Sequence, residues 1–179
     1  YGSGDLIFCS HEREVLNRRL RFWLSREMRG SAARPCPAGV SRIAEGIEGL
    51  RAGVRQALDA LSMREQISGL NGPYHYEDLG LYRLLVGLRD SEEMPHFFEE
   101  SLGPLVQYDR EHSTDLVHTL ETFFRANANA SQAARALYIH RNTLAYRLQR
   151  IAEITGLDLE DPEARLVLQL SLKIHHLQP

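Results

Sequence analysis

The residues best equipped for chemistry gather near position 140, and the chemistry that they suit is hydrogen bonding to a nucleic acid. Arg141, Asn142 and Thr143 are consecutive, and Tyr146 follows one helical turn later. Arginine can donate two hydrogen bonds to guanine, asparagine can pair with adenine in the same bidentate manner, and threonine offers either its hydroxyl or its methyl group. These four side chains are therefore our candidates for contact with bases.

A second set of polar side chains is better suited to phosphate groups. Arg147 and Arg150 follow in the same segment, and Gln132 and Arg135 precede it. Between residues 131 and 157 the sequence has four arginines and one glutamate, which give a local net charge of +3 in a chain of net charge −3. Because the chain as a whole is slightly acidic, any contact with a nucleic acid has to be local.

A helix over residues 141–155 would position these side chains. At 100° per residue, four residues of the segment fall within roughly 40° of one line and form an apolar stripe. They are Leu144, Leu148, Ile151 and Thr155. The polar residues lie mostly on the other side of the helix. Arg147 lies only about 60° from the stripe, so packing or a salt bridge at the edge of the core is an open alternative for it.

A shorter helix is expected just before this one. Ser131 is a suitable N-cap for the strong helix formers that follow it, and three alanines there permit close approach of a second helix. Residues 138–140 leave room for a sharp turn, with His140 directly before the second helix. This arrangement is typical of a helix-turn-helix, whose second helix enters the major groove of DNA. Similar helix pairs also occur in other all-helical proteins, so the spacing alone does not establish that this pair binds DNA.

The segment from His140 to Leu172 resembles the C-terminal helix-turn-helix of the PucR/CdaR family of bacterial transcription regulators. The family's runs His-Arg-Asn-Thr-Leu, Tyr-Arg-Leu, Arg-Ile and Thr-Gly-Leu occur here in the same order, at residues 140–144, 146–148, 150–151 and 155–157. The resemblance implies a regulator of transcription that binds double-stranded DNA. It also implies that an unidentified small-molecule effector is sensed by a domain outside this chain.

The first 76 residues show a different pattern, in which short apolar runs alternate with amphipathic segments. We expect strands at residues 6–9, 38–43 and 74–76, and helices at residues 11–29 and 49–67. This alternation predicts an α/β unit. In the second helix, the residues expected to point inward are Leu50, Val54, Ala57, Leu58, Leu61 and Met63.

Two runs in this half, Gly39–Leu61 and Tyr76–Leu85, resemble the degenerate GGDEF-like domain of PucR/CdaR regulators. The resemblance implies a partial ferredoxin-like unit whose earlier strands precede residue 1, and we expect the chain to be part of a longer polypeptide. Residues 2–6 fall about where a cyclase of this type keeps its catalytic signature. Only Asp5 there could hold a metal, so nucleotide cyclisation is not expected.

The remaining segments predict helices. One is expected at residues 76–89, one after a cap at residues 91–93, and one from about residue 105 to 112. Residues 113–115 should cap a helix with Leu116, Leu120, Phe123 and Phe124 inward. Asp161-Pro162-Glu163 should start the last helix. Its expected apolar face consists of Leu166, Val167, Leu170, Ile174 and Leu177.

The predicted fold is therefore mainly α with a small α/β part. A partial GGDEF-like α/β domain is expected at residues 1–76, a helical linker at 77–112 and a helix-turn-helix domain at 113–179. One short recognition helix contacts too few bases for selective affinity, so we expect a homodimer or a larger oligomer. The alternative is a protein–protein interaction or signalling module built on the GGDEF-like domain.

The sequence contains no recognisable catalytic or metal-binding arrangement. Its eight histidines are scattered, and there is no phosphate-binding glycine loop or nucleophile elbow. We therefore predict no enzymatic activity, no metal and no cofactor. Cys9 and Cys36 do not form a disulfide framework, and neither a signal peptide nor a membrane span is recognisable. The expected location is the cytoplasm.

Overall fold

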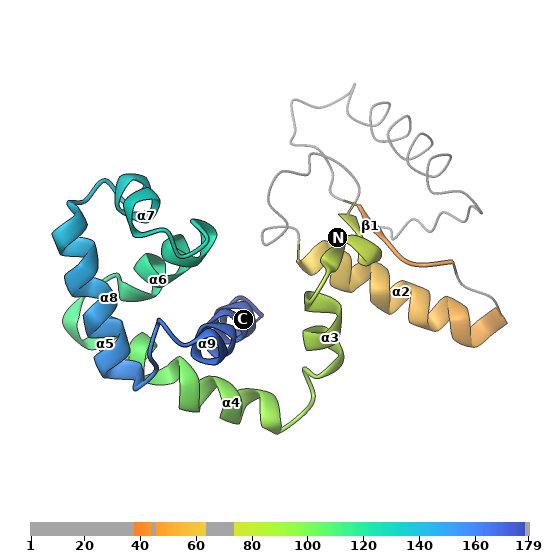
Figure 1. Cartoon of the computed structure of the whole chain (residues 1–179). Coiled ribbons are helices and arrows are strands. Elements are labelled where there is room, and N and C mark those ends of the chain that lie inside the picture. The colour runs from red at the N-terminus through yellow and green to blue at the C-terminus, as the bar shows by residue number, and fades with distance from the viewer. Residues whose placement is uncertain (1–37, 44–45, 64–73, 178–179) are drawn as a thin grey trace. The chain divides into compact units, whose positions relative to one another are not determined.

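The structure, a computed structural model, describes residues 38–43, 46–63 and 74–177 (Figure 1). Most of these residues are helical, and the sheet that they contain has two short strands. A mainly α fold with a small sheet was expected from the sequence. The strand predicted at residues 6–9, the helix predicted at residues 11–29 and both cysteines lie outside the described residues.

The chain divides into two compact units, Tyr1–Gly87 and Leu88–Pro179. In the first, strand β1 (Gly39–Val40) pairs in parallel with strand β2 (Tyr74–His75). Helix α2 (Gly46–Ser62) connects them along the chain and packs on β1 (Figure 1). The approach is so close that a Cβ atom on Gly39 would lie 1.8 Å from the carbonyl oxygen of Ala57.

The buried face of α2 differs from the predicted one. Gly53 and Ala60 are buried, whereas Leu50, Val54 and Leu58 are 48%, 39% and 53% exposed. The prediction that these three large side chains point inward is wrong. The closest approach of α2 to β1 is at Ala57, whose backbone lies against Gly39.

The single helix predicted at residues 76–89 is also wrong. The 3-10 helix η2 (Tyr76–Leu79) and helix α3 (Tyr82–Gly87) occupy this region. They are separated at Gly80, whose backbone has φ +54° and ψ −124°. That conformation is incompatible with a continuing helix and is readily adopted only by glycine.

The second unit consists of helices (Figure 1), each of which contributes buried side chains. They are α4 (Glu93–Ser101), α5 (Gly103–His112), α6 (Leu116–Arg125), α7 (Ala130–Ala136), α8 (Arg141–Thr155) and α9 (Pro162–His175). Helix α4 packs against α9, and α5 packs against α8. The domain boundaries expected after residues 76 and 112 stay a prediction, and in the structure α4 and α5 belong to the same compact unit as the helices that follow them.

Helix α9 begins as predicted, because the carboxylate of Asp161 accepts hydrogen bonds from the N–H groups of Glu163 and Ala164 at 3.2 and 3.4 Å. Its predicted apolar face is partly wrong. Leu166 is 55% exposed, while Ile174 is buried as expected. Five of the seven residues 166–172 are apolar, so their spacing does not fix a face. The other buried residues are Ala164, Leu168, Ser171 and Leu172.

Ser171 explains part of this orientation. Its hydroxyl is fully buried and lies 2.6 Å from the hydroxyl of Ser101 on α4. A buried hydroxyl without a partner costs free energy, so the pair favours the helix rotation that brings the two oxygens together. The hydroxyl of Ser171 also donates to the carbonyl oxygen of Val167.

Helix α6 is capped by a residue outside the predicted cap. The side chain of Asp115, at the N-cap position, makes no capping hydrogen bond. Instead, the carboxylate of Asp109 on α5 accepts hydrogen bonds from the N–H groups of Leu116 and Val117 at 2.9 and 2.8 Å. Ser113 has a left-handed backbone, φ +52°, and this tight turn brings Asp109 to the start of α6.

Replacing Asp109 with alanine should therefore destabilise the protein. We expect a loss of about 0.5–2 kcal/mol in the free energy of unfolding, because helix N–H groups lose their acceptors. Urea denaturation followed by circular dichroism measures the loss. Asp115→Ala is the matched control and should change little, and an equal loss in this control would contradict the assignment of the cap to Asp109.

Candidate nucleic-acid interface

Helices α7 and α8 form a helix-turn-helix, and α7 begins with a cap from Asn129. The side-chain oxygen of Asn129 accepts a hydrogen bond from the N–H group of Gln132 at 3.0 Å. The predicted cap, Ser131, is wrong, because this residue lies within α7. Asn127 and Ala128 both have left-handed backbones, φ +52° and +59°, and this turn places Asn129 at the entrance of the helix.

The turn between the two helices is held by backbone hydrogen bonds. The N–H group of Tyr138 donates to the carbonyl oxygen of Arg135, and that of Ile139 donates to that of Ala134 at 3.0 Å. His140 then caps α8, and its Nδ1 atom accepts a hydrogen bond from the N–H group of Asn142 at 3.2 Å. The predicted place of His140 directly before α8 is confirmed, as is the end of that helix at Gly156, which has φ +68°.

The two helices share a small core with α6. Ala133, Ala134, Leu144 and Phe123 are all buried, and Leu137, Ile139 and Leu148 pack around them. The two alanines permit the close approach that was expected. Along α8 the predicted stripe is confirmed, since Leu144 and Ile151 are fully buried while Leu148 and Thr155 are half-buried.

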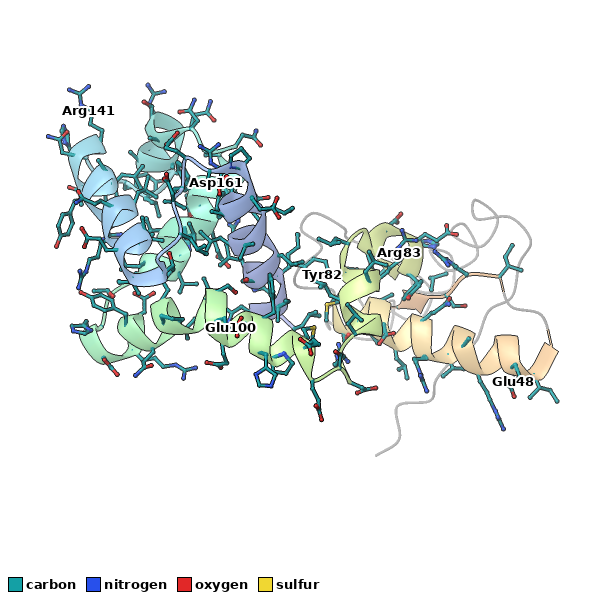
Figure 2. All side chains as sticks on the ribbon, turned by 60° about the horizontal axis from the view of Figure 1, so that its bottom comes forward. Glu48, Tyr82, Arg83, Glu100, Arg141 and Asp161 are labelled. Carbon is teal, nitrogen blue, oxygen red and sulfur yellow. The ribbon has the colours of Figure 1, made fainter. Side chains whose placement is uncertain are left out.

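The four candidates for base contact all lie on the exposed side of α8. Arg141, Asn142 and Thr143 are exposed in its first turn, and Tyr146 is 69% exposed. Figure 2 shows Arg141 at the outer end of α8, with its side chain directed away from the other helices. Neither this guanidinium nor the amide of Asn142 bonds to another side chain in the part of the chain that the structure describes. Their donors and acceptors are available to a ligand.

The candidates for phosphate contact divide into two groups. Gln132 and Arg135 on α7 are exposed, and within the described ranges their side chains have no hydrogen-bonding partner. Arg147 and Arg150 are half-buried and are already bonded to their own domain.

Arg147 connects α8 to α6. Its Nη1 atom donates a hydrogen bond to the hydroxyl oxygen of Thr119 at 3.0 Å, and Thr119 is fully buried. This geometry corresponds to the alternative interpretation of Arg147 as a residue at the edge of the core. The sequence could not identify Thr119 as the partner, because it precedes Arg147 by 28 positions.

Arg150 connects α8 to α5. Its Nη1 atom donates to the carboxylate of Glu153 at 2.9 Å, and its guanidinium carbon lies 5.0 Å from the ring centre of Tyr108. The contact with Tyr108 and the hydrogen bond to Glu153 raise the pKa of Arg150 above its ordinary value. The hydrogen bond from Arg150, with a second one from Gln149, lowers the pKa of the Glu153 carboxyl.

One exposed residue at this interface was not predicted from the sequence. Tyr138, in the turn, is 96% exposed and has a left-handed backbone, φ +55°. A large aromatic residue in a turn that favours glycine or asparagine is the sequence signal that could have indicated it.

Nothing in the described part of the chain suggests a metal centre, since it contains no group of three or more metal-ligating side chains. None of the helices described there is both long and apolar enough to cross a membrane.

Comparison with known proteins gives the family. Residues 116–174, from the start of α6 nearly to the end of α9, match the family model of the PucR C-terminal helix-turn-helix domain. The expected resemblance to the PucR/CdaR family is thereby confirmed, and this part of the chain is a PucR-type helix-turn-helix domain. Residues 116–174 are therefore called the PucR domain. It contains the exposed first turn of α8 together with the core that supports it.

Curated relatives extend this result. The chain is 34% identical over 124 residues to the DNA-binding transcriptional activator AdeR of Bacillus subtilis, which covers 69% of this chain and 29% of AdeR. It is 39% identical over 104 residues to the proline-responsive transcriptional activator PutR of the same species, and this match covers 58% of this chain and 25% of PutR. It is 40% identical over 102 residues to the carbohydrate diacid regulator of Escherichia coli, and this match covers 56% of this chain and 26% of that regulator. The chain thus spans between a quarter and three tenths of the length of these relatives.

The core of the PucR domain can be tested at Leu144. Leu144→Ala should lower the free energy of unfolding by about 2–5 kcal/mol, because a fully buried leucine leaves a cavity. Leu148→Ala removes the same atoms from a half-buried position and should cost less. Urea denaturation of both variants gives the comparison, and equal losses would contradict the difference in burial.

The half-buried and the exposed arginines of α8 should also differ in their effect on the stability of the PucR domain. Arg147→Ala should lower the free energy of unfolding by about 0.5–1.5 kcal/mol, because it removes a hydrogen bond to a buried hydroxyl. Arg141→Ala, on the same helix, should stay within about 0.5 kcal/mol of the parent. If Arg141→Ala proved the more destabilising in urea, the exposed arginine would be part of the core contacts.

Proposed function

We propose that the PucR domain binds double-stranded DNA sequence-specifically, with α8 in the major groove, as part of a bacterial transcription regulator. The observation that carries this proposal is the first turn of α8. Arg141, Asn142 and Thr143 are exposed there, and neither the guanidinium nor the amide is bonded within the described part of the chain. A helix-turn-helix inserts this end of its second helix into the groove.

The contacts divide between bases and phosphates by position. Arg141, Asn142, Thr143 and Tyr146 are the proposed base contacts, because they lie on the exposed side of α8 nearest its N-terminus. Gln132 and Arg135 are the first candidates for phosphate, since the first helix of such a motif crosses the DNA backbone. Arg147 and Arg150 remain candidates, but their present bonds to Thr119 and Glu153 make a structural role the simpler one.

The relatives support regulation of transcription, since AdeR is described as a DNA-binding transcriptional activator and PutR as a proline-responsive one. For this chain, we propose that an effector is sensed outside these 179 residues, because the matching relatives are three to four times longer than their matched part. The whole protein would act in the cytoplasm, where bacterial DNA is accessible, and would not be an enzyme.

A homodimer or larger oligomer is the proposed binding form. One helix-turn-helix contacts only a few base pairs, and two-fold pairing doubles the length of DNA that is recognised. The site should then consist of two inverted half-sites about one helical turn apart.

The N-terminal unit is proposed to be part of a degenerate GGDEF-like domain, with the boundaries expected from the sequence. Support comes from the order β1, α2, β2, in which two parallel strands are joined through a helix. Such a crossover is the basic element of an α/β sheet.

The central experiment is selection of bound duplexes from a random DNA pool. Asn142→Ala should weaken binding to the selected duplex by about 1–3 kcal/mol and should relax the base preference at one position of each half-site, because a bidentate contact is lost. Mobility shifts with the selected duplex and its single-base variants measure both effects.

Gln169→Ala is the control, since it removes another exposed amide from a helix of the same domain. It should bind like the parent. If both Arg141→Ala and Asn142→Ala bound the selected duplex as tightly as the parent, α8 would not be in the groove.

A further inference from the structure

The ring of Tyr138 is almost entirely exposed to solvent. At 96%, its exposed fraction exceeds that of every other large hydrophobic side chain in the described residues. Placing an aromatic ring against the protein would remove apolar area from water and stabilise the fold. The domain obtains no such stabilisation from Tyr138, so packing does not explain why a tyrosine stands there.

The backbone of Tyr138 gives no reason for a tyrosine either. Its φ of +55° lies in the left-handed region, which disfavours residues with a Cβ atom and suits glycine. The turn is fixed on both sides, by the bonds from Tyr138 to Arg135 and from Ile139 to Ala134. A glycine would make the same backbone bonds with less strain. The side chain is thus exposed at the expense of stability.

The position of Tyr138 suggests what the side chain contacts. It lies in the turn between α7, which carries the exposed Arg135, and α8, which begins with the exposed Arg141. In a bound helix-turn-helix the first helix crosses the DNA backbone and the start of the second lies in the groove. A residue between the two helices is therefore at the edge of the groove, where the sugar–phosphate chain passes.

We propose that Tyr138 contacts this sugar–phosphate chain, with its ring against the deoxyribose and its hydroxyl donating a hydrogen bond to a phosphate oxygen. The inference rests on the proposed DNA binding and deepens it. Tyrosine hydroxyls are among the usual donors to phosphate, and such contacts fix the orientation of the protein without selecting a base. Tyr138 would thereby set how the first turn of α8 enters the groove.

Two variants of the intact protein test the contact with the selected duplex and with an unrelated duplex. Tyr138→Phe removes only the hydroxyl and should raise Kd about 10- to 150-fold for both, as expected for one hydrogen bond to a charged group. Tyr138→Gly also removes the ring and should raise Kd further for both. Because tyrosine is uncharged, neither variant should change the slope of log Kd against log salt, whereas Arg135→Ala should reduce it by about one.

Ser113→Gly is the matched control. Ser113 is also exposed and left-handed, with φ +52°, but it lies between α5 and α6. Both glycine variants should unfold at the same temperature as the parent or higher, and only Tyr138→Gly should bind DNA more weakly.

Three results would overturn the inference. In the first, Tyr138→Gly binds like the parent while Asn142→Ala does not, which leaves the proposed function intact. In the second, Tyr138→Gly unfolds at a lower temperature, which makes the side chain structural. In the third, the loss affects only the selected duplex, which makes the contact one with a base. If neither Tyr138→Gly nor Asn142→Ala changed the affinity, the proposed function itself would fail.

Discussion

The burial of Leu144 and Ile151 against the rest of the C-terminal unit is the contact on which the candidate interface depends. Both side chains are fully buried, and they lie on one side of α8. That contact fixes the rotation of the helix about its axis, so it also determines which side chains are left in solvent. Arg147 and Arg150 strengthen the same attachment through Thr119 and Tyr108. The exposed first turn is therefore presented by a helix that is held along most of its length.

Features that depend on neighbours in sequence were predictable. The cap at Asp161, the place of His140 and the end of α8 at Gly156 each involve residues within a few positions, so the local pattern contains the required information. The cap of α6 was not predictable, because Asp109 reaches it through a turn whose backbone geometry the sequence does not specify. The N-cap of α7 was predicted at Ser131 and is Asn129 for a similar reason. Two consecutive residues with left-handed backbones precede Asn129, and the sequence does not specify this turn.

Apolar faces were predictable only where the stripe is narrow. On α8 the large apolar residues Leu144, Leu148 and Ile151 lie along one line, and the opposite side is polar, so only one side is suited to burial. On α2 the apolar residues are spread more widely around the helix, and Gly53 and Ala60 are buried while Leu50 and Leu58 are exposed. For the candidate interface, the residues in the first turn of α8 follow from helical periodicity. The partners of Arg147 and Arg150 depend on tertiary packing, and the exposure of Tyr138 depends on a backbone angle.

The distribution of charge along α8 has an electrical consequence. Peptide dipoles give the N-terminus of a helix a partial positive charge, and the guanidinium of Arg141, which has no partner among the described residues, adds to it at that end. Toward the other end, Arg150 is paired with Glu153, so its charge is largely compensated. The helix therefore has its positive pole at its exposed first turn. In the field of a polyanion this polarity would exert a torque that turns the N-terminal end toward the phosphates before any contact forms.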